Sequence, residues 1–190
     1  MSNEDLKERF FDAAQEILAT DGYGGLKLAA VCKRLKVTTG AFYHAFGSWN
    51  EFTSEFLHNW RRQRTTLLVE LARGAGDPVG QLESLRRATI ELRHASEAAI
   101  RVWAAVDPAV AVIQEQVDQE RYEVVLEAMQ KLVGKKEAPA YADWGLNVLI
   151  GYELSTGAQT PADLEWQLTQ VLSAALARGE ERKSARRRTA

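Results

Sequence analysis

Apolar residues recur every three or four positions along most of the chain, a spacing that predicts amphipathic helices. Leu28, Val31, Cys32 and Leu35, for example, fall at i, i+3, i+4 and i+7 on one side of a short helix. No segment shows the alternation of apolar and polar residues that is typical of a strand. The sequence therefore predicts an all-α protein of about nine helices.

Turn and capping residues divide the N-terminal part into three helices. Helical spacing runs from residue 3 to residue 20, and Asp21-Gly22 then ends that helix. A helix over 28–35 stops at a turn, in which the Thr38 hydroxyl can accept a hydrogen bond from a backbone N–H two or three residues further on. Thr38 thereby predicts the start of a third helix, over 39–46.

The helix predicted over 39–46 has one slim side and one aromatic side. Thr39 and Gly40 are small, whereas Phe42 and Phe46 are large and apolar. A slim leading end can enter the major groove of DNA while the two phenylalanines anchor the helix to its domain. We therefore expect residues 28–46 to form a helix-turn-helix.

Charge supports this expectation. No Asp or Glu occurs from Gly22 to Asn50, yet this segment contains Lys27, Lys33, Arg34 and Lys36. In a chain of net charge -2, such a local basic segment is typical of a surface that meets phosphates. On charge alone, a helical hairpin with a solvated polar face remains an equal alternative.

The segment from residue 22 to residue 52 resembles the N-terminal DNA-binding domain of the TetR (tetracycline repressor) family of bacterial regulators. Seven residues stand where the family motif has the same or a similar type: Leu35, Val37, Thr38, Gly40, Phe42, Tyr43 and Phe46. Three positions depart. Lys36 replaces a turn glycine, so a left-handed backbone there would cost about 1 kcal/mol; Ala45 replaces a common histidine, and Lys27 replaces a capping Ser or Thr.

This resemblance implies a transcriptional regulator with a three-helix DNA-binding domain, followed by a helical domain for dimerisation and for binding a small ligand. The residues expected to contact double-stranded DNA are Lys27, Lys36, Thr38, Thr39, Gly40, Ala41, Tyr43 and His44. We predict a DNA-binding domain over 1–47, an effector and dimer domain over 48–181, and a disordered basic tail over 182–190. The expected protein is a repressor that binds a palindromic operator.

Further caps predict the helices of the second domain. Ser48 and Glu51 form a capping-box pattern for a helix whose apolar face continues through Leu67, Leu68 and Leu71 to about residue 73. Asp77-Pro78 and Asp107-Pro108 each pair a cap with a proline suited to the first helical turn. Gly134 is a plausible end for the helix that begins at residue 108.

Two apolar helices are predicted at the end of the chain, over 141–156 and 161–178. No downstream segment could cover them, so we predict that they pair with a second copy in a four-helix bundle. Closure of the protomer's own core is the alternative. The residues predicted for the dimer interface are Leu146, Leu149, Ile150, Leu164, Leu168, Val171, Leu172 and Ala175.

Aromatic residues in the second domain suggest the wall of a ligand pocket, because aromatic side chains commonly line apolar sites. The candidates are Trp103, Tyr122, Trp144 and Tyr152, with ordinary core packing as the alternative. Few charges interrupt the apolar stretches, so a hydrophobic ligand is expected.

Several classes of protein fit the sequence poorly. No apolar run approaches the roughly 18 residues of a membrane span, and the N-terminus lacks signal-peptide zones, which predicts a cytoplasmic protein without a membrane partner. The single Cys32 excludes an internal disulfide and suits a core position. The three histidines lack metal-ligand spacing, so we expect no enzyme, metal or cofactor. A helical ligand-binding or scaffold protein without sequence-specific DNA binding is the alternative function.

Overall fold

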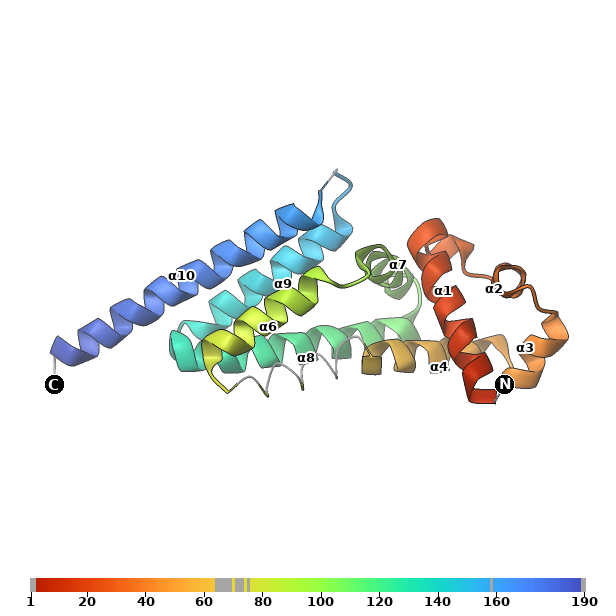
Figure 1. Cartoon of the computed structure of the whole chain (residues 1–190), viewed down its shortest axis with the longest axis horizontal. Coiled ribbons are helices and arrows are strands. Elements are labelled where there is room, and N and C mark those ends of the chain that lie inside the picture. Colours follow the sequence, from red (N-terminus) through yellow and green to blue (C-terminus); the bar gives the residue numbers. More distant parts are fainter. Residues whose placement is uncertain (1–2, 64–69, 71–73, 75, 158, 189–190) are drawn as a thin grey trace. The chain divides into compact units, whose positions relative to one another are not determined.

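The computed structural model describes residues 3–63, 70, 74, 76–157 and 159–188, except the side chain of Arg186. These residues form helices and no strand, which confirms the all-α prediction for this part of the chain. The helices, labelled as in Figure 1, are α1 (Asn3–Gly25), α2 (Leu28–Leu35), α3 (Thr39–Ala45), α4 (Trp49–Arg61), α6 (Pro78–Ile90), α7 (His94–Ala104), α8 (Pro108–Leu132), α9 (Ala138–Leu154) and α10 (Pro161–Arg188).

Not every predicted feature falls within the described residues. Leu67, Leu68 and Leu71, which were expected to extend the face of α4, lie outside them. Among the helices that are described, none has the length and apolar character that crossing a membrane requires.

The chain divides into two compact units. Unit 1 comprises Met1–Arg62 and Arg93–Glu115, and unit 2 comprises Gln63–Leu92 and Gln116–Ala190. Residues 48–62 and 93–115 are therefore packed with the N-terminal helices, whereas the sequence analysis assigned them to the second domain. One buried contact illustrates why: the Trp60 indole of α4 donates a hydrogen bond of 2.7 Å to the Glu97 carboxylate of α7.

The core of unit 1 is a cluster of phenylalanines. Phe10 of α1, Phe42 and Phe46 at α3, and Phe52 of α4 are almost completely buried. Their ring centroids lie between 5.0 and 6.5 Å apart, mostly edge to face. Such ring pairs add about 0.5–1.5 kcal/mol each beyond the buried area. The short helix α3 is thus held from its inner side, as the sequence analysis predicted.

The turn between α2 and α3 contains the strained backbone that the sequence suggested. Lys36 has φ 56° and ψ 42°, and it is the one non-glycine residue with positive φ in the described part of the chain. The neighbouring amides close the end of α2, with Val37 N–H donating to the Cys32 carbonyl over 3.0 Å. Lys36 therefore occupies a left-handed position that glycine adopts more readily.

Substitutions at Lys36 separate backbone strain from side-chain effects. Lys36→Gly and Lys36→Ala both delete the charged side chain, but only glycine relieves the left-handed strain. We expect the free energy of unfolding in urea to be about 1 kcal/mol higher for Lys36→Gly than for Lys36→Ala. Equal stabilities of the two variants would contradict a left-handed residue 36.

The predicted helix caps are present. The Thr38 hydroxyl accepts from the Ala41 N–H over 3.2 Å, and the Ser48 hydroxyl accepts from the Glu51 N–H over 3.0 Å. The Glu51 carboxylate accepts from the Gly47 N–H, one residue before the position expected in a capping box. These bonds fix both ends of the segment that carries α3.

Unit 2 packs α6, α9 and α10 with the part of α8 that follows Glu115. Its core includes Leu82 of α6, Met129 and Leu132 of α8, and Val171 and Ala175 of α10. The helix α9 begins three residues before the predicted Tyr141, at Ala138, with Pro139 in its first turn. The interior of this unit is mainly aliphatic, unlike the phenylalanine core of unit 1.

The basic tail predicted to be disordered is helical in its described residues, because α10 continues to Arg188. Ion pairs support this extension. The Arg178 guanidinium donates a hydrogen bond of 2.9 Å to the Glu181 carboxylate, and Lys183 Nζ donates one of 2.7 Å to Glu180 Oε1. A charged segment without an apolar face can therefore remain helical through pairs three or four residues apart.

Candidate nucleic-acid interface and cavity

The outer surface of α2, the turn and α3 presents the residues expected to contact DNA. Ala41 is half-buried, and the others are exposed: Lys27, Lys36, Thr38, Thr39, Gly40, Tyr43 and His44. Tyr43 is the largest of them, with 54% of its surface accessible. The opposite side of α3 is buried through Phe42 and Ala45. The same seven-residue helix therefore has an inner face for the core and an outer face available for a partner.

Gly40 lies in the first turn of α3 with no steric need for glycine. A Cβ atom added there would meet only the Thr38 hydroxyl oxygen, at an ordinary contact distance of 3.6 Å. Its backbone is not left-handed, since the residues with positive φ in the described chain are Gly22, Lys36, Gly76 and Gly134. The fold of unit 1 would accept alanine at residue 40, so any requirement for glycine must come from outside the protomer.

The surface around α2 and α3 is less basic than the acid-free segment from Gly22 to Asn50 suggested. Arg34 NH1 lies 3.3 Å from Glu16 Oε2, and Arg34 NH2 lies 3.6 Å from Asp21 Oδ2. Both acids belong to α1, outside the acid-free segment, so a purely sequential count missed them. Arg34 is therefore partly neutralised, whereas Lys27 at the start of α2 and Lys36 in the turn before α3 are exposed.

Trp49 packs within unit 1. Its ring centroid lies 5.0 Å from that of Phe52 and 5.9 Å from that of Phe42. Trp103 is also part of unit 1, where it stacks on Tyr23 with centroids 5.1 Å apart. Its indole N–H donates to the Asp107 carboxylate over 3.2 Å. Trp103 thus supports the N-terminal unit instead of lining a cavity of unit 2.

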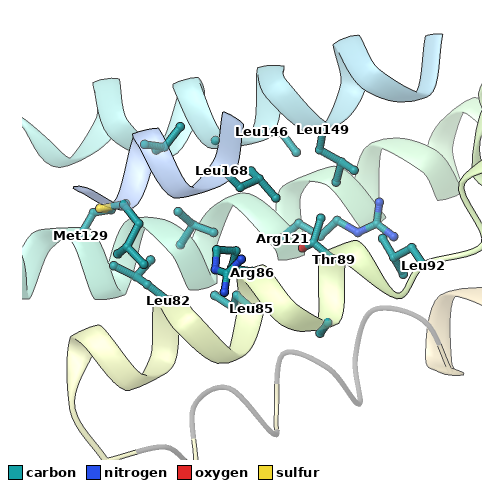
Figure 2. Close-up of a pocket in the computed structure, with 15 residues that line it drawn as sticks. Leu82, Leu85, Arg86, Thr89, Leu92, Arg121, Met129, Leu146, Leu149 and Leu168 are labelled. Carbon is teal, nitrogen blue, oxygen red and sulfur yellow. The ribbon is translucent and has the colours of Figure 1, made fainter. Parts of the chain in front are cut away.

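Unit 2 contains a cavity of about 110 Å³ among α6, α8, α9 and α10 (Figure 2). Eleven of its fifteen lining residues are leucine, valine, alanine or methionine. The remaining four are Arg86, Thr89, Arg121 and Gly145, and no aspartate or glutamate is among the described residues that line the cavity. The cavity is therefore apolar with a few polar groups, which is the usual character of a small-molecule site.

The four aromatic residues predicted to line a pocket do not line this cavity. Trp103 belongs to unit 1, Trp144 is 43% exposed, and Tyr122 and Tyr152 are half-buried elsewhere. The prediction was wrong for this cavity because its walls are built from aliphatic side chains. Residues of α6, such as Leu85 and Thr89, were missed because spacing along one helix does not reveal what faces it.

The predicted dimer-interface residues are mostly covered within one chain. Leu149, Leu164, Val171 and Ala175 are buried in the protomer, Ile150 is half-buried, and Leu146, Leu168 and Leu172 line the cavity. Burial leaves the first four of these residues little surface for a second copy, whereas pairing through the half-buried Leu146, Ile150, Leu168 and Leu172 stays a prediction. The alternative, closure of the protomer's own core, holds for this apolar face, because α10 packs against both α6 and α9.

The exposed sides of these helices carry different large residues. Trp144 of α9 and Trp166 of α10 are 43% and 65% exposed. Exposed tryptophans are uncommon on a protein surface that meets only water. The sequence analysis overlooked Trp166 because it lies off the regular apolar stripe of α10.

Arg86, which lines the cavity, is the centre of an ion-pair network. Arg86 of α6 donates to both oxygens of Glu83, over 2.9 and 2.7 Å, and to Glu165 of α10 over 2.9 Å. Hydrogen bonds from Arg86 hold the pKa of the Glu83 carboxyl at about 2. Because folding lowers this pKa, the Glu83–Arg86 pair stabilises the folded protein at pH values above the ordinary pKa of a carboxyl group. This stabilisation is lost as the pH falls towards 2. Arg86 thus ties α6 to α10.

Comparison with known proteins identifies the N-terminal part. Residues 10–53 match the model of the family described as bacterial regulatory proteins, tetR family. This span runs from Phe10 to Thr53 and includes the turn, α3 and the Ser48 cap. Among curated proteins, none matches the chain.

Solved structures share the fold over nearly the whole chain. A transcriptional regulator from Rhodococcus sp. Rha1 is 25% identical, with a TM-score of 0.75 over 90% of this chain and 96% of that one. A TetR-family regulator from Streptomyces coelicolor is 17% identical, with a TM-score of 0.75 and coverage of 92% and 95%. A regulator from Saccharomonospora viridis, solved in complex with choline, is 12% identical, with a TM-score of 0.74 and coverage of 90% and 96%.

The motif match and the shared fold agree. The matched residues contain the exposed α3 and the phenylalanines that hold it, and the helices that follow have the arrangement seen in solved regulators. Members of this group act as transcription factors and not as enzymes. Residues 10–53 therefore match the DNA-binding domain of the TetR family, in a chain that shares the fold of solved TetR-family transcriptional regulators.

Proposed function

We propose that this regulator is a homodimeric repressor, which a small and mostly apolar ligand releases from a palindromic operator. The observation that carries the proposal is the two-sided helix α3. Its inner face is fixed by Phe42 and Phe46, and its outer face exposes Thr39, Gly40 and Tyr43. A rigidly held helix with a slim exposed tip is suited to reading a major groove.

In the proposed complex, Thr39, Gly40, Ala41 and Tyr43 enter the major groove. Phosphates are contacted by Lys27, Lys36, Thr38, Tyr43 and His44. Phosphate contacts set the register and supply much of the affinity, whereas contacts with base edges select the sequence. Binding should therefore weaken steeply as salt concentration rises.

We propose that the dimer forms through the exposed sides of α9 and α10. Trp144, Leu154 and Trp166 are large apolar residues exposed on these helices, and tryptophan is enriched among the residues that dominate interface energy. A two-fold axis between these surfaces would present two copies of α3. Half-sites about one helical turn apart then follow from the symmetry.

The cavity of unit 2 is the proposed effector site. Its mainly aliphatic walls suit a hydrophobic ligand, and a solved regulator of the same fold holds choline. A ligand can release DNA only if it prefers a conformation that fits the operator poorly. By reciprocity, operator DNA must lower the affinity for that ligand by the same factor.

Gly40→Ala is expected to weaken operator binding about tenfold at fixed salt, because a methyl group would hold α3 away from the groove. The free energy of unfolding should not fall, since the fold has room for the added Cβ. Gly24→Ala is the matched control, because Gly24 also has open space and lies outside α3. Unchanged affinity of Gly40→Ala, measured by fluorescence anisotropy, would contradict a close approach of α3 to DNA.

A mobility shift with the DNA that flanks the gene tests the proposal against its main alternative. A helical ligand-binding or scaffold protein would retard this fragment no more than a random fragment of equal length. The proposed repressor should retard it selectively, in competition with excess random DNA. Failure to retard any duplex would exclude the DNA-dependent function.

A further inference from the structure

We infer that the ligand of the unit 2 cavity is a small carboxylate, with an apolar chain of about four to six carbons and its negative group held by Arg121. This inference deepens the proposed function and rests on it, because it names the class of the effector. It also revises the expectation of a purely hydrophobic ligand, which the sequence analysis based on the scarcity of charges.

The size of the cavity limits the apolar part of the ligand. Its volume of about 110 Å³ is somewhat below the roughly 150 Å³ of an apolar cavity that binds benzene. One small ring or one short chain fills such a space. A larger ligand would have to extend beyond this space or displace the packed side chains of α6, α8, α9 or α10.

The charges around the cavity select the sign of the ligand. Within the part of the chain that the structure describes, the lining residues include two guanidinium groups and no carboxylate. Arg86 already donates to Glu83 and Glu165, which balance its charge. The Arg121 guanidinium has five N–H donors in a fixed fork, so it can bind a ligand carboxylate in addition to partners within the protein. In surroundings of low polarity, such a charge favours an anion over a neutral or cationic ligand.

The arrangement of the lining residues gives the ligand a direction. Figure 2 shows Arg121, Thr89 and Leu92 towards one end of the cavity, and Leu82 and Met129 towards the other. The Thr89 hydroxyl can donate a second hydrogen bond at the polar end. We therefore place the carboxylate beside Arg121 and Thr89, and the apolar chain along α6 towards Met129.

Calorimetric titration of the full chain without DNA tests the class of ligand. Linear carboxylates from acetate to decanoate should bind about fourfold more tightly for each added methylene, up to about six carbons. Longer chains should gain nothing further, since the cavity is then full. Hexanoate should bind at least about tenfold more tightly than hexanamide, which has a similar shape without the charge. Choline serves as the cationic probe and should bind more weakly than hexanoate.

Variants test the assigned residue. Arg121→Met should remove the preference for hexanoate over hexanamide and leave the affinity for hexanamide nearly unchanged. Arg87→Met is the matched control, because Arg87 lies on α6, is largely exposed and does not line the cavity. It should retain the tenfold preference. The comparison of acid with amide on the unaltered protein stays decisive even if Arg121→Met fails to fold.

Two readouts separate this inference from the proposed function. If hexanamide or choline binds as tightly as hexanoate, the carboxylate inference is overturned, whether or not DNA is released. If hexanoate binds with the expected preference but leaves operator affinity unchanged, the carboxylate site stands and the role of the cavity in release is wrong. Release of DNA by hexanoate, but not by hexanamide at equal concentration, supports both.

Discussion

Replacing Trp166 by glutamate should leave the protein monomeric at micromolar concentration. Trp166 of α10 is 65% exposed in the protomer, so the substitution removes no core contact. In the proposed dimer its ring would be buried, and a carboxylate there would have to lose its hydration. We expect the dissociation constant of the dimer to rise at least about a hundredfold, as is typical when a central tryptophan is lost. Sedimentation equilibrium measures this directly.

Loss of dimerisation should also weaken DNA binding. Two linked copies of α3 act at high effective concentration, so a monomer should bind the operator about two orders of magnitude more weakly. Val106→Glu is the control, since Val106 is 68% exposed and belongs to unit 1. It should leave both the mass and the affinity unchanged. A Trp166→Glu protein that stays dimeric would show that the pairing surface lies elsewhere.

Tyr43→Ala should weaken operator binding at least tenfold at fixed salt, a loss of about 1.4 kcal/mol. The Tyr43 ring is more than half exposed and packs nearly perpendicular to the Phe42 ring, with centroids 5.4 Å apart. Its loss should therefore affect the partner more than the fold. Titration of a labelled operator by anisotropy gives the affinity, and thermal unfolding gives the stability.

Tyr43→Phe divides the expected effect between the ring and the hydroxyl. If the hydroxyl donates to a phosphate, Tyr43→Phe should lose part of the tenfold effect and reduce the dependence of affinity on salt. If the ring packs on the sugar or base edges, Tyr43→Phe should bind like the unaltered protein. Should Tyr43→Ala bind the operator as well as the unaltered protein does, α3 is not the recognition helix.

Local structure could be predicted from the sequence. The Thr38 cap, the left-handed Lys36 and the end of α8 at Gly134 depend on backbone geometry within a few residues, which residue type reports directly. The burial of Phe42 and Phe46 followed from their spacing on one short helix. These features place the exposed residues of α3, so the outer face of this helix was accessible to sequence reasoning.

The packing partners of each apolar helix face could not be predicted in the same way. The apolar stripe of α10 looks alike whether α6 or a second chain covers it, and the structure shows Leu164 and Ala175 buried within one chain. The lining of the cavity depends on which helices face one another, so aliphatic residues of α6 replaced the expected aromatics. Arg34 appeared uncompensated because its acidic partners, Glu16 and Asp21, are distant in sequence.

Footprinting on duplexes that the protein selects from genomic DNA tests the central claim most directly, which is that two copies of α3 read successive turns of one duplex. We expect two protected patches whose centres are about one helical turn apart, related by a sequence palindrome. Both patches should disappear together with Tyr43→Ala. A single protected patch, or no duplex retained even in dilute buffer, would contradict this claim.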